Sequence, residues 1–297
     1  MLKSRLRWFI PSFVVLMLIP SVGVPAAQET AASRVEYHTF FSKVLNKEKT
    51  YGIYLPPGYD ASKQRYPILY FLHGLFNTER QWEEKGGKVV LDQLITDGKI
   101  PPLVVAIPDG DNSFYVDSVD STARYEAYMV EEFIPMVEST YRVKADKEHR
   151  GITGLSMGGF GALTLAMRHP SLFVTATAHS AVLIPVPFDQ LPQRLRDSYA
   201  SQLFAAAFGS PVNEGYWRER HPIDLVATAK NLKTVAWYFD CGTEDRYGFN
   251  KGAERFDAVL TAAGVPHEFH LYPGNHGWEY ALTHFPESLA FFVSHLR

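Results

Sequence analysis

The five residues Gly154-Leu-Ser-Met-Gly158 constrain the fold of this 297-residue chain more than any other stretch. They match the G-x-S-x-G pattern, in which a serine stands on a sharp turn between a strand and a helix. Glycine on each side of the turn removes the Cβ atoms that would collide where two chain segments pass closely. Residues 150–155 are typical of the strand and the stretch up to Arg168 of the helix, so Ser156 is expected at the apex as a nucleophile.

Strand-like and helix-like stretches alternate through the second half of the chain. The continuous apolar runs 66–72 and 103–107 are typical of strands buried on both faces. This alternation predicts an α/β fold with a mostly parallel central sheet and helices on both faces. Strands are expected at 35–44, 49–55, 66–72, 103–107, 150–155, 172–178, 234–239 and 267–272, and helices at 87–95, 125–141, 157–168, 251–263 and 278–296. The proline-broken stretch 182–228 is expected to be a short lid-like insertion, whose aromatic residues fit internal packing better than substrate stacking.

The amino-terminal 27 residues have the order of a secretory signal. A positive leader (Lys3, Arg5 and Arg7) precedes an apolar core at 8–19 and a small-residue exit at 24–27. Cleavage near that exit predicts a secreted or periplasmic protein with one domain over residues 28–297 and no stable membrane span once processed. An uncleaved amino-terminal anchor is the alternative.

Composition excludes several other classes of protein. The formal net charge is −3, and no run of Lys or Arg follows residue 10, which argues against nucleic-acid binding. The single cysteine, Cys241, rules out an internal disulfide and a cysteine-rich metal cluster.

A serine nucleophile needs a histidine base, and the base needs an acid to hold its tautomer. At this kind of turn the partners follow in the order serine, acid, histidine. His276 lies in a flexible turn directly after the last predicted strand, where a catalytic imidazole belongs. Asp245, in the loop after the preceding strand, is the expected acid, and Asp240 at the end of that strand is the reserve.

Acyl transfer also needs backbone donors for the developing oxyanion. One is expected to be the amide of Met157, directly after the nucleophile and at the start of its helix. The other is expected to be the amide of Leu75, in the loop opened by His73-Gly74, where His73 fixes the loop. This chemistry requires no metal or cofactor.

With these sites placed, the chain resembles the esterase D / putative esterase family of α/β-hydrolases. That family includes S-formylglutathione hydrolases, feruloyl, acetylxylan and tributyrin-type esterases, and mycolyltransferases. The matching stretches run in family order across most of the chain, at residues 54–59, 72–75, 112–117, 154–159, 241–245 and 275–280. The resemblance implies an α/β-hydrolase fold, a Ser156–Asp245–His276 triad, and an oxyanion hole from the Leu75 and Met157 amides. It also implies substrate contacts, at Asn112, Ser113, Phe114, Tyr115 and Trp278.

The function predicted is that of an exported serine carboxylesterase, acting on small-molecule or carbohydrate esters such as acetyl or feruloyl groups. An acyltransferase of the mycolyltransferase type would use the same core residues. An S-formylglutathione hydrolase-like thioesterase is a further alternative, although those enzymes carry His at the position of Leu155 and lack an export signal. A catalytically silent binding protein with this fold would be expected to have an incomplete triad. The acyl group, the alcohol and the oligomeric state stay open at this point.

Overall fold

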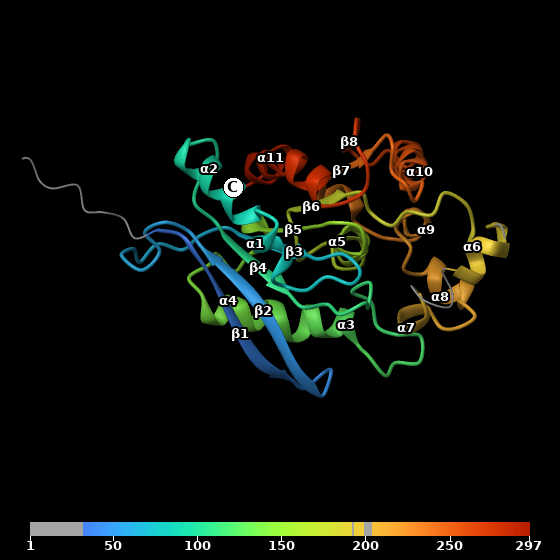
Figure 1. Cartoon of the computed structure of the whole chain (residues 1–297), viewed down its shortest axis with the longest axis horizontal. Coiled ribbons are helices and arrows are strands. Elements are labelled where there is room, and N and C mark those ends of the chain that lie inside the picture. The colour runs from blue at the N-terminus through green and yellow to red at the C-terminus, as the bar shows by residue number, and fades with distance from the viewer. Residues whose placement is uncertain (1–31, 192, 199–203) are drawn as a thin grey trace, which may run out of the picture. The chain divides into compact units, whose positions relative to one another are not determined.

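The computed structural model describes residues 32–191, 193–198 and 204–297, which fall in the compact unit Ala31–Arg297 (Figure 1). The expected signal peptide lies outside the described residues. An eight-stranded sheet in this described part has the order β1-β2-β4-β3-β5-β6-β7-β8. β2 pairs antiparallel with β1 and β4, and every other neighbouring pair is parallel. The strands are β1 (Arg34–Ser42), β2 (Lys47–Leu55), β3 (Ile68–Leu72), β4 (Val104–Pro108), β5 (Arg150–Gly154), β6 (Thr175–His179), β7 (Ala236–Gly242) and β8 (His267–Tyr272).

Helices cover both faces of this sheet, as the alternating sequence pattern predicted. Along β3, Ile68, Tyr70 and Leu72 enter one apolar cluster, while Leu69 and Phe71 enter the other. Side chains of α2 and α11 complete the second cluster, and those of α5, α10 and the helical run from α3 to α4 complete the first (Figure 1). The main helices are α1 (Gln81–Glu84), α2 (Gly87–Thr96), α3 (Tyr125–Ala127), α4 (Ile134–Thr140), α5 (Met157–Arg168), α10 (Phe249–Ala262) and α11 (Trp278–Ser294).

Two predicted elements differ from the structure in ways that matter for the site. β7 continues to Gly242, because Cys241 and Gly242 still pair with Leu271 and Tyr272 of β8. Asp240 therefore lies within the strand and not at its end. The predicted helix 125–141 contains a wider π-helical segment, Tyr128–Phe133, between α3 and α4.

The insertion at 182–228 contains short helices. Those in its described part are α6 (Gln193–Ser198), α7 (Ala205–Phe208), α8 (Glu214–Arg218) and α9 (Pro222–Leu225). Its aromatic residues pack on one another, with the Trp217 ring centroid 5.2 Å from that of Phe204 and 4.8 Å from that of Phe208. This is the internal packing that the sequence favoured.

Candidate active site

Ser156 lies on the turn between β5 and α5 with φ 59° and ψ −116°, a left-handed backbone that is costly for a serine. The flanking glycines make the turn sterically feasible. A Cβ on Gly158 would lie 1.9 Å from the carbonyl oxygen of Leu72 in β3, and one on Gly154 would lie 2.3 Å from Gly158. Hydrogen bonds hold the turn, since the Ser156 amide donates to the His179 carbonyl (3.0 Å).

Asp245 and His276 meet beyond the carboxyl ends of β7 and β8. The two side chains are joined by a 2.8 Å contact between Asp245 Oδ2 and His276 Nδ1. Burial opposes the charge of Asp245, but the hydrogen bonds from His276 and the Tyr247 amide outweigh it, so the pKa of Asp245 is lowered. An ionised carboxylate only accepts hydrogen bonds, so His276 Nδ1 carries the proton and Nε2 is left as a base.

Ser156 and His276 line the same cavity, of about 240 Å³, whose wall is mainly apolar. The two side chains come from different strand ends and reach one space, although Ser156 makes no side-chain hydrogen bond to a described residue. Such contacts often tighten only when substrate is bound. The cavity is lined by Gly74, Leu75, Phe76, Asn77, Phe114, Leu155, Ser156, Val182, Phe204, Tyr247, Phe249, His276, Gly277 and Trp278.

The loop after β3 fixes the direction of the Leu75 N–H by holding the Gly74 carbonyl, which belongs to the same peptide group. His73 Nε2 accepts from the Gly110 amide (2.9 Å), so its proton is on Nδ1, which donates to the Gly74 carbonyl at 2.9 Å. In a trans peptide the carbonyl and the following N–H point in opposite directions. Fixing the Gly74 carbonyl therefore fixes the direction of the Leu75 N–H. Met157, the first residue of α5, has an amide with no acceptor within its helix.

A buried charged group that sequence reasoning missed supports this loop. Lys49 is almost fully buried and lies 2.9 Å from Asp109 and 3.2 Å from Asp111. Burial opposes the Asp109 charge, but the Lys49 ammonium and the hydrogen bond from the Asp111 amide outweigh it and lower the pKa of Asp109. The signal for this group was a lysine facing inward on β2, with an acidic turn directly after β4.

Asp240 and Cys241, the other reactive candidates in this region, lie inside β7. Asp240 Oδ2 is 2.8 Å from His179 Nδ1, so the reserve acid faces a different histidine from His276. The Cys241 sulfur lies 3.4 Å from Asp245 Oδ2. Burial and the Asp245 charge raise the pKa of the thiol, which keeps Cys241 protonated and unsuited to act as a nucleophile.

Of the side chains expected to contact substrate, Phe114 and Trp278 line the cavity, and the others hold the surrounding loops. Asn112 Oδ1 accepts from the Phe76 amide (2.8 Å), Ser113 Oγ donates to the Gly110 carbonyl (2.6 Å), and the Tyr115 hydroxyl donates to the His73 carbonyl (3.3 Å). The structure therefore does not bring Asn112, Ser113 and Tyr115 to the cavity wall.

Two aromatic residues that the sequence did not single out lie at the cavity. Phe76 is 71% exposed with φ 60°, and Tyr247 is 50% exposed with its ring edge-on to His276 at 4.8 Å. Exposed aromatic side chains at a cavity are typical of a binding surface. Phe76 directly follows Leu75, and Tyr247 lies two residues after Asp245; these positions were the only sequence signal.

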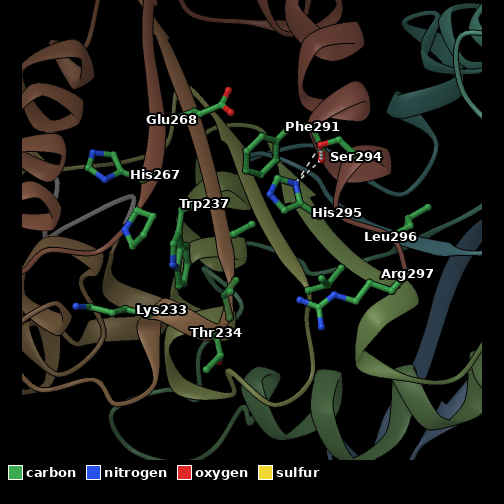
Figure 2. Close-up of a pocket in the computed structure, with 14 residues that line it drawn as sticks. Lys233, Thr234, Trp237, His267, Glu268, Phe291, Ser294, His295, Leu296 and Arg297 are labelled. Atoms are coloured by element: carbon green, nitrogen blue, oxygen red, sulfur yellow. Dashed lines mark hydrogen bonds between the residues drawn. The ribbon is translucent and has the colours of Figure 1, made fainter.

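Figure 2 shows a larger hollow, of about 570 Å³, at the opposite ends of the strands. It lies beside the first residues of β7 and β8 and the end of α11, whereas ligands of open α/β sheets bind beyond the carboxyl ends. Its two histidines are engaged, His267 with Asp257 and His295 with the Phe291 carbonyl. The smaller cavity at Ser156 is therefore the candidate active site.

Within the described ranges, no three His, Cys, Asp or Glu side chains gather into a group that could hold a metal ion. Over the same ranges, none of the helices combines the length and the apolar character needed to cross a membrane.

A mostly parallel sheet, a strained serine between β5 and α5, and an Asp–His pair beyond β7 and β8 define an α/β-hydrolase. Residues 42–292 match the family described as putative esterase, and the chain belongs to that family.

Individual relatives carry esterase names. The chain is 35% identical over 147 residues to an endo-1,4-beta-xylanase/feruloyl esterase of Xylanibacter ruminicola. That alignment covers 47% of this chain and 20% of the Xylanibacter protein. It is 26% identical over 250 residues to an acetyl esterase of Caldicellulosiruptor saccharolyticus, in 81% of this chain and 91% of that one. A solved ferulic acid esterase matches with a TM-score of 0.76 and 31% identity, over 90% of this chain and all of that one. The chain thus spans a fifth of the Xylanibacter protein but nearly the whole of the other two.

Proposed function

We propose that this protein is a serine carboxylesterase that works through an acyl-enzyme on Ser156. The observation that carries the proposal is the 2.8 Å Asp245–His276 contact at a cavity that also contains Ser156. A nucleophile, a base with a free Nε2 and an acid that fixes its tautomer are the parts that acyl transfer requires.

In the first half-reaction, Ser156 Oγ attacks the ester carbonyl carbon while His276 Nε2 takes the hydroxyl proton. Negative charge moves to the carbonyl oxygen, which the Leu75 and Met157 amides stabilise. The tetrahedral intermediate then expels the alcohol, and imidazolium Nε2 returns the proton to the leaving oxygen. Asp245 stabilises the imidazolium throughout, and its lowered pKa keeps it ionised at neutral pH.

In the second half-reaction, water takes the place of the alcohol. His276 Nε2 accepts a proton from the water as its oxygen attacks the acyl carbon, and the oxyanion forms in the same place. Collapse of this intermediate breaks the bond to Ser156 Oγ, which recovers its proton from His276, and a carboxylic acid leaves. Each oxyanion donor is worth about 10²–10³ in rate.

The substrates proposed are carbohydrate-linked acyl groups, acetyl or feruloyl. The names of the relatives support this class of ester. The apolar wall of the cavity suits an acyl group, and the exposed rings of Phe76 and Tyr247 suit stacking against a larger group outside it. The basic, apolar and small-residue order of the first 27 residues supports export before the enzyme meets these esters.

The test compares the Ser156→Ala variant with the wild-type protein on p-nitrophenyl acetate. Loss of the nucleophile should lower kcat by about 10⁴–10⁶ while the melting temperature and circular dichroism stay close to those of the wild type. Near-normal turnover in this variant would exclude the proposed mechanism.

A further inference from the structure

A second serine–histidine–aspartate chain is buried beside the candidate site. Ser288 Oγ in α11 lies 2.9 Å from His179 Nε2 in β6, and His179 Nδ1 lies 2.8 Å from Asp240 Oδ2 in β7. Ser288, His179 and Asp240 are only 2%, 0% and 1% exposed, so an ester cannot reach them. The three side chains contact one another as in a catalytic triad, serine to histidine to aspartate. Because they are buried, their role must be a different one.

The His179 ring is held at both nitrogens. Its Nε2 contacts Ser288 Oγ, which also lies 3.1 Å from the Phe285 carbonyl one turn earlier in α11. Its Nδ1 faces the Asp240 carboxylate on the neighbouring strand. Neither Asp240 oxygen has an aligned hydrogen-bond donor in the described part of the chain, so this buried carboxylate depends on the His179 ring and on the nearby Tyr280 phenol. The His179–Asp240 pair is therefore a buried polar contact that joins two neighbouring strands.

Two phenols lie close to this pair. Burial and the Asp240 charge raise the pKa of both Tyr238, on β7, and Tyr280, on α11, so neither adds a charge at neutral pH. The His179–Asp240 pair thus has no competing ionised group from these two residues.

The backbone of His179 connects this pair to the nucleophile. Its carbonyl accepts the Ser156 amide proton (3.0 Å), and three residues later the Val182 amide donates to the Ser156 carbonyl (3.2 Å). Between them, the Ser180 amide donates to the Asp240 carbonyl (2.8 Å). Both backbone polar groups of Ser156 are thus bonded to the segment that begins at His179.

We propose that His179 and Asp240 are positioning residues for the nucleophile. Their contact joins β6 to β7, and the Ser288 hydroxyl joins it to α11, so the end of β6 is restrained on two sides. Because that strand end holds the amide and the carbonyl of Ser156, the pair keeps the left-handed turn in the geometry from which Oγ attacks. This inference rests on the proposed role of Ser156.

The test is a double-mutant cycle with His179→Gln, Asp240→Asn and the combined variant, assayed on p-nitrophenyl acetate. Each single change leaves one member of the pair without its partner and should lower kcat per active site about tenfold, with KM within about twofold. The combined variant replaces the buried His179–Asp240 contact by two neutral amides and should recover to within about threefold of wild type. Active sites are counted by burst titration, so misfolded protein does not enter kcat.

His169→Gln is the matched control. His169 Nε2 also lies 2.8 Å from a buried carboxylate, that of Glu126, but at the far end of α5, about 18 Å along the helix from Met157. This variant should lower the melting temperature without changing kcat per site. If His179→Gln and Asp240→Asn do the same, or if the combined variant is no better than the worse single one, the positioning role is wrong.

Ser288→Ala keeps the inference testable if the single variants do not fold. It removes only the hydroxyl that anchors His179 Nε2 and should lower kcat about threefold with KM unchanged. An unchanged kcat would overturn the proposal. An active Ser156→Ala variant would instead overturn the proposed function, so the two failures are distinguishable.

Discussion

Asp245 reaches His276 because β7 and β8 run parallel and end at the same level. Their register pairs Gly242 with Tyr272, three residues before the aspartate and four before the histidine. The two following loops then turn toward each other, and the Glu244 amide donates to the Gly274 carbonyl at 2.9 Å. Asp240, five residues earlier on β7, lies against His179 on the other neighbouring strand. The strand register therefore decides which aspartate serves which histidine.

Exchanging each aspartate for asparagine should separate these two roles. Asp245→Asn leaves the shape of the site but removes the group that fixes the His276 tautomer, so kcat should fall by about 10⁴. Asp240→Asn should cost about tenfold, through the position of Ser156. Steady-state kinetics on p-nitrophenyl acetate at neutral pH measures both, and a larger loss at Asp240 would contradict the assignment of the acid.

Gly158 should not tolerate a side chain. A Cβ at this position would lie 1.9 Å from the Leu72 carbonyl, a backbone atom of β3 that cannot move aside. Gly158→Ala should therefore give insoluble protein, or a melting temperature lower by about 10 °C or more with no esterase activity. Gly215→Ala in α8 is the control, because a Cβ there meets only the Asn213 side chain, at 3.6 Å. Equal thermal stability of the two variants would argue against the close approach.

Stability should depend on Asp109 at acid pH. The folded-state pKa of Asp109 lies below its ordinary value, so the unfolded chain takes up a proton there that the folded protein does not. The contribution is therefore complete above about pH 4, the ordinary pKa, and is lost as the pH falls toward the folded-state value. Urea unfolding of the wild type should show this decline, and Asp109→Asn should be less stable at pH 7 with a shallower decline. If the stability of Asp109→Asn declines with acid as steeply as that of the wild type, the contribution assigned to Asp109 is wrong.

Phe76 and Tyr247 should affect large substrates more than small ones. Removing either ring, by Phe76→Ala or Tyr247→Ala, should lower kcat/KM for an acetylated or feruloylated xylo-oligosaccharide about tenfold more than for p-nitrophenyl acetate, the scale of one stacking contact. Phe41→Ala is the matched control, since Phe41 is 58% exposed and does not line the cavity. It should leave the ratio of the two activities unchanged. The same ratio in all three variants would mean that the rings do not contact substrate.

The sequence predicted the parts of this site that local patterns encode. The serine turn, the alternating strands and the turn after β8 each have a signature within about ten residues, and the structure has a strand or turn at each of them. Residues joined only by the tertiary fold had no such signature. Nothing near His179 in sequence indicates that it contacts Asp240 and Ser288. An inward-facing Lys49 and an acidic turn after β4 can be read locally, but only the tertiary fold shows that the two meet. Asp240 looked like a strand end because its continued pairing with β8 depends on register, which local sequence does not define.

The central claim is a covalent acyl group on Ser156. Rapid mixing with p-nitrophenyl acetate should give a burst of p-nitrophenol equal to the enzyme concentration, if deacylation is the slower step. After an acid quench, peptide mass spectrometry should find one acetyl group on Ser156, and the Ser156→Ala variant should show neither burst nor adduct. An acetyl group that forms on another residue at the same rate, or a burst retained by Ser156→Ala, would contradict the account.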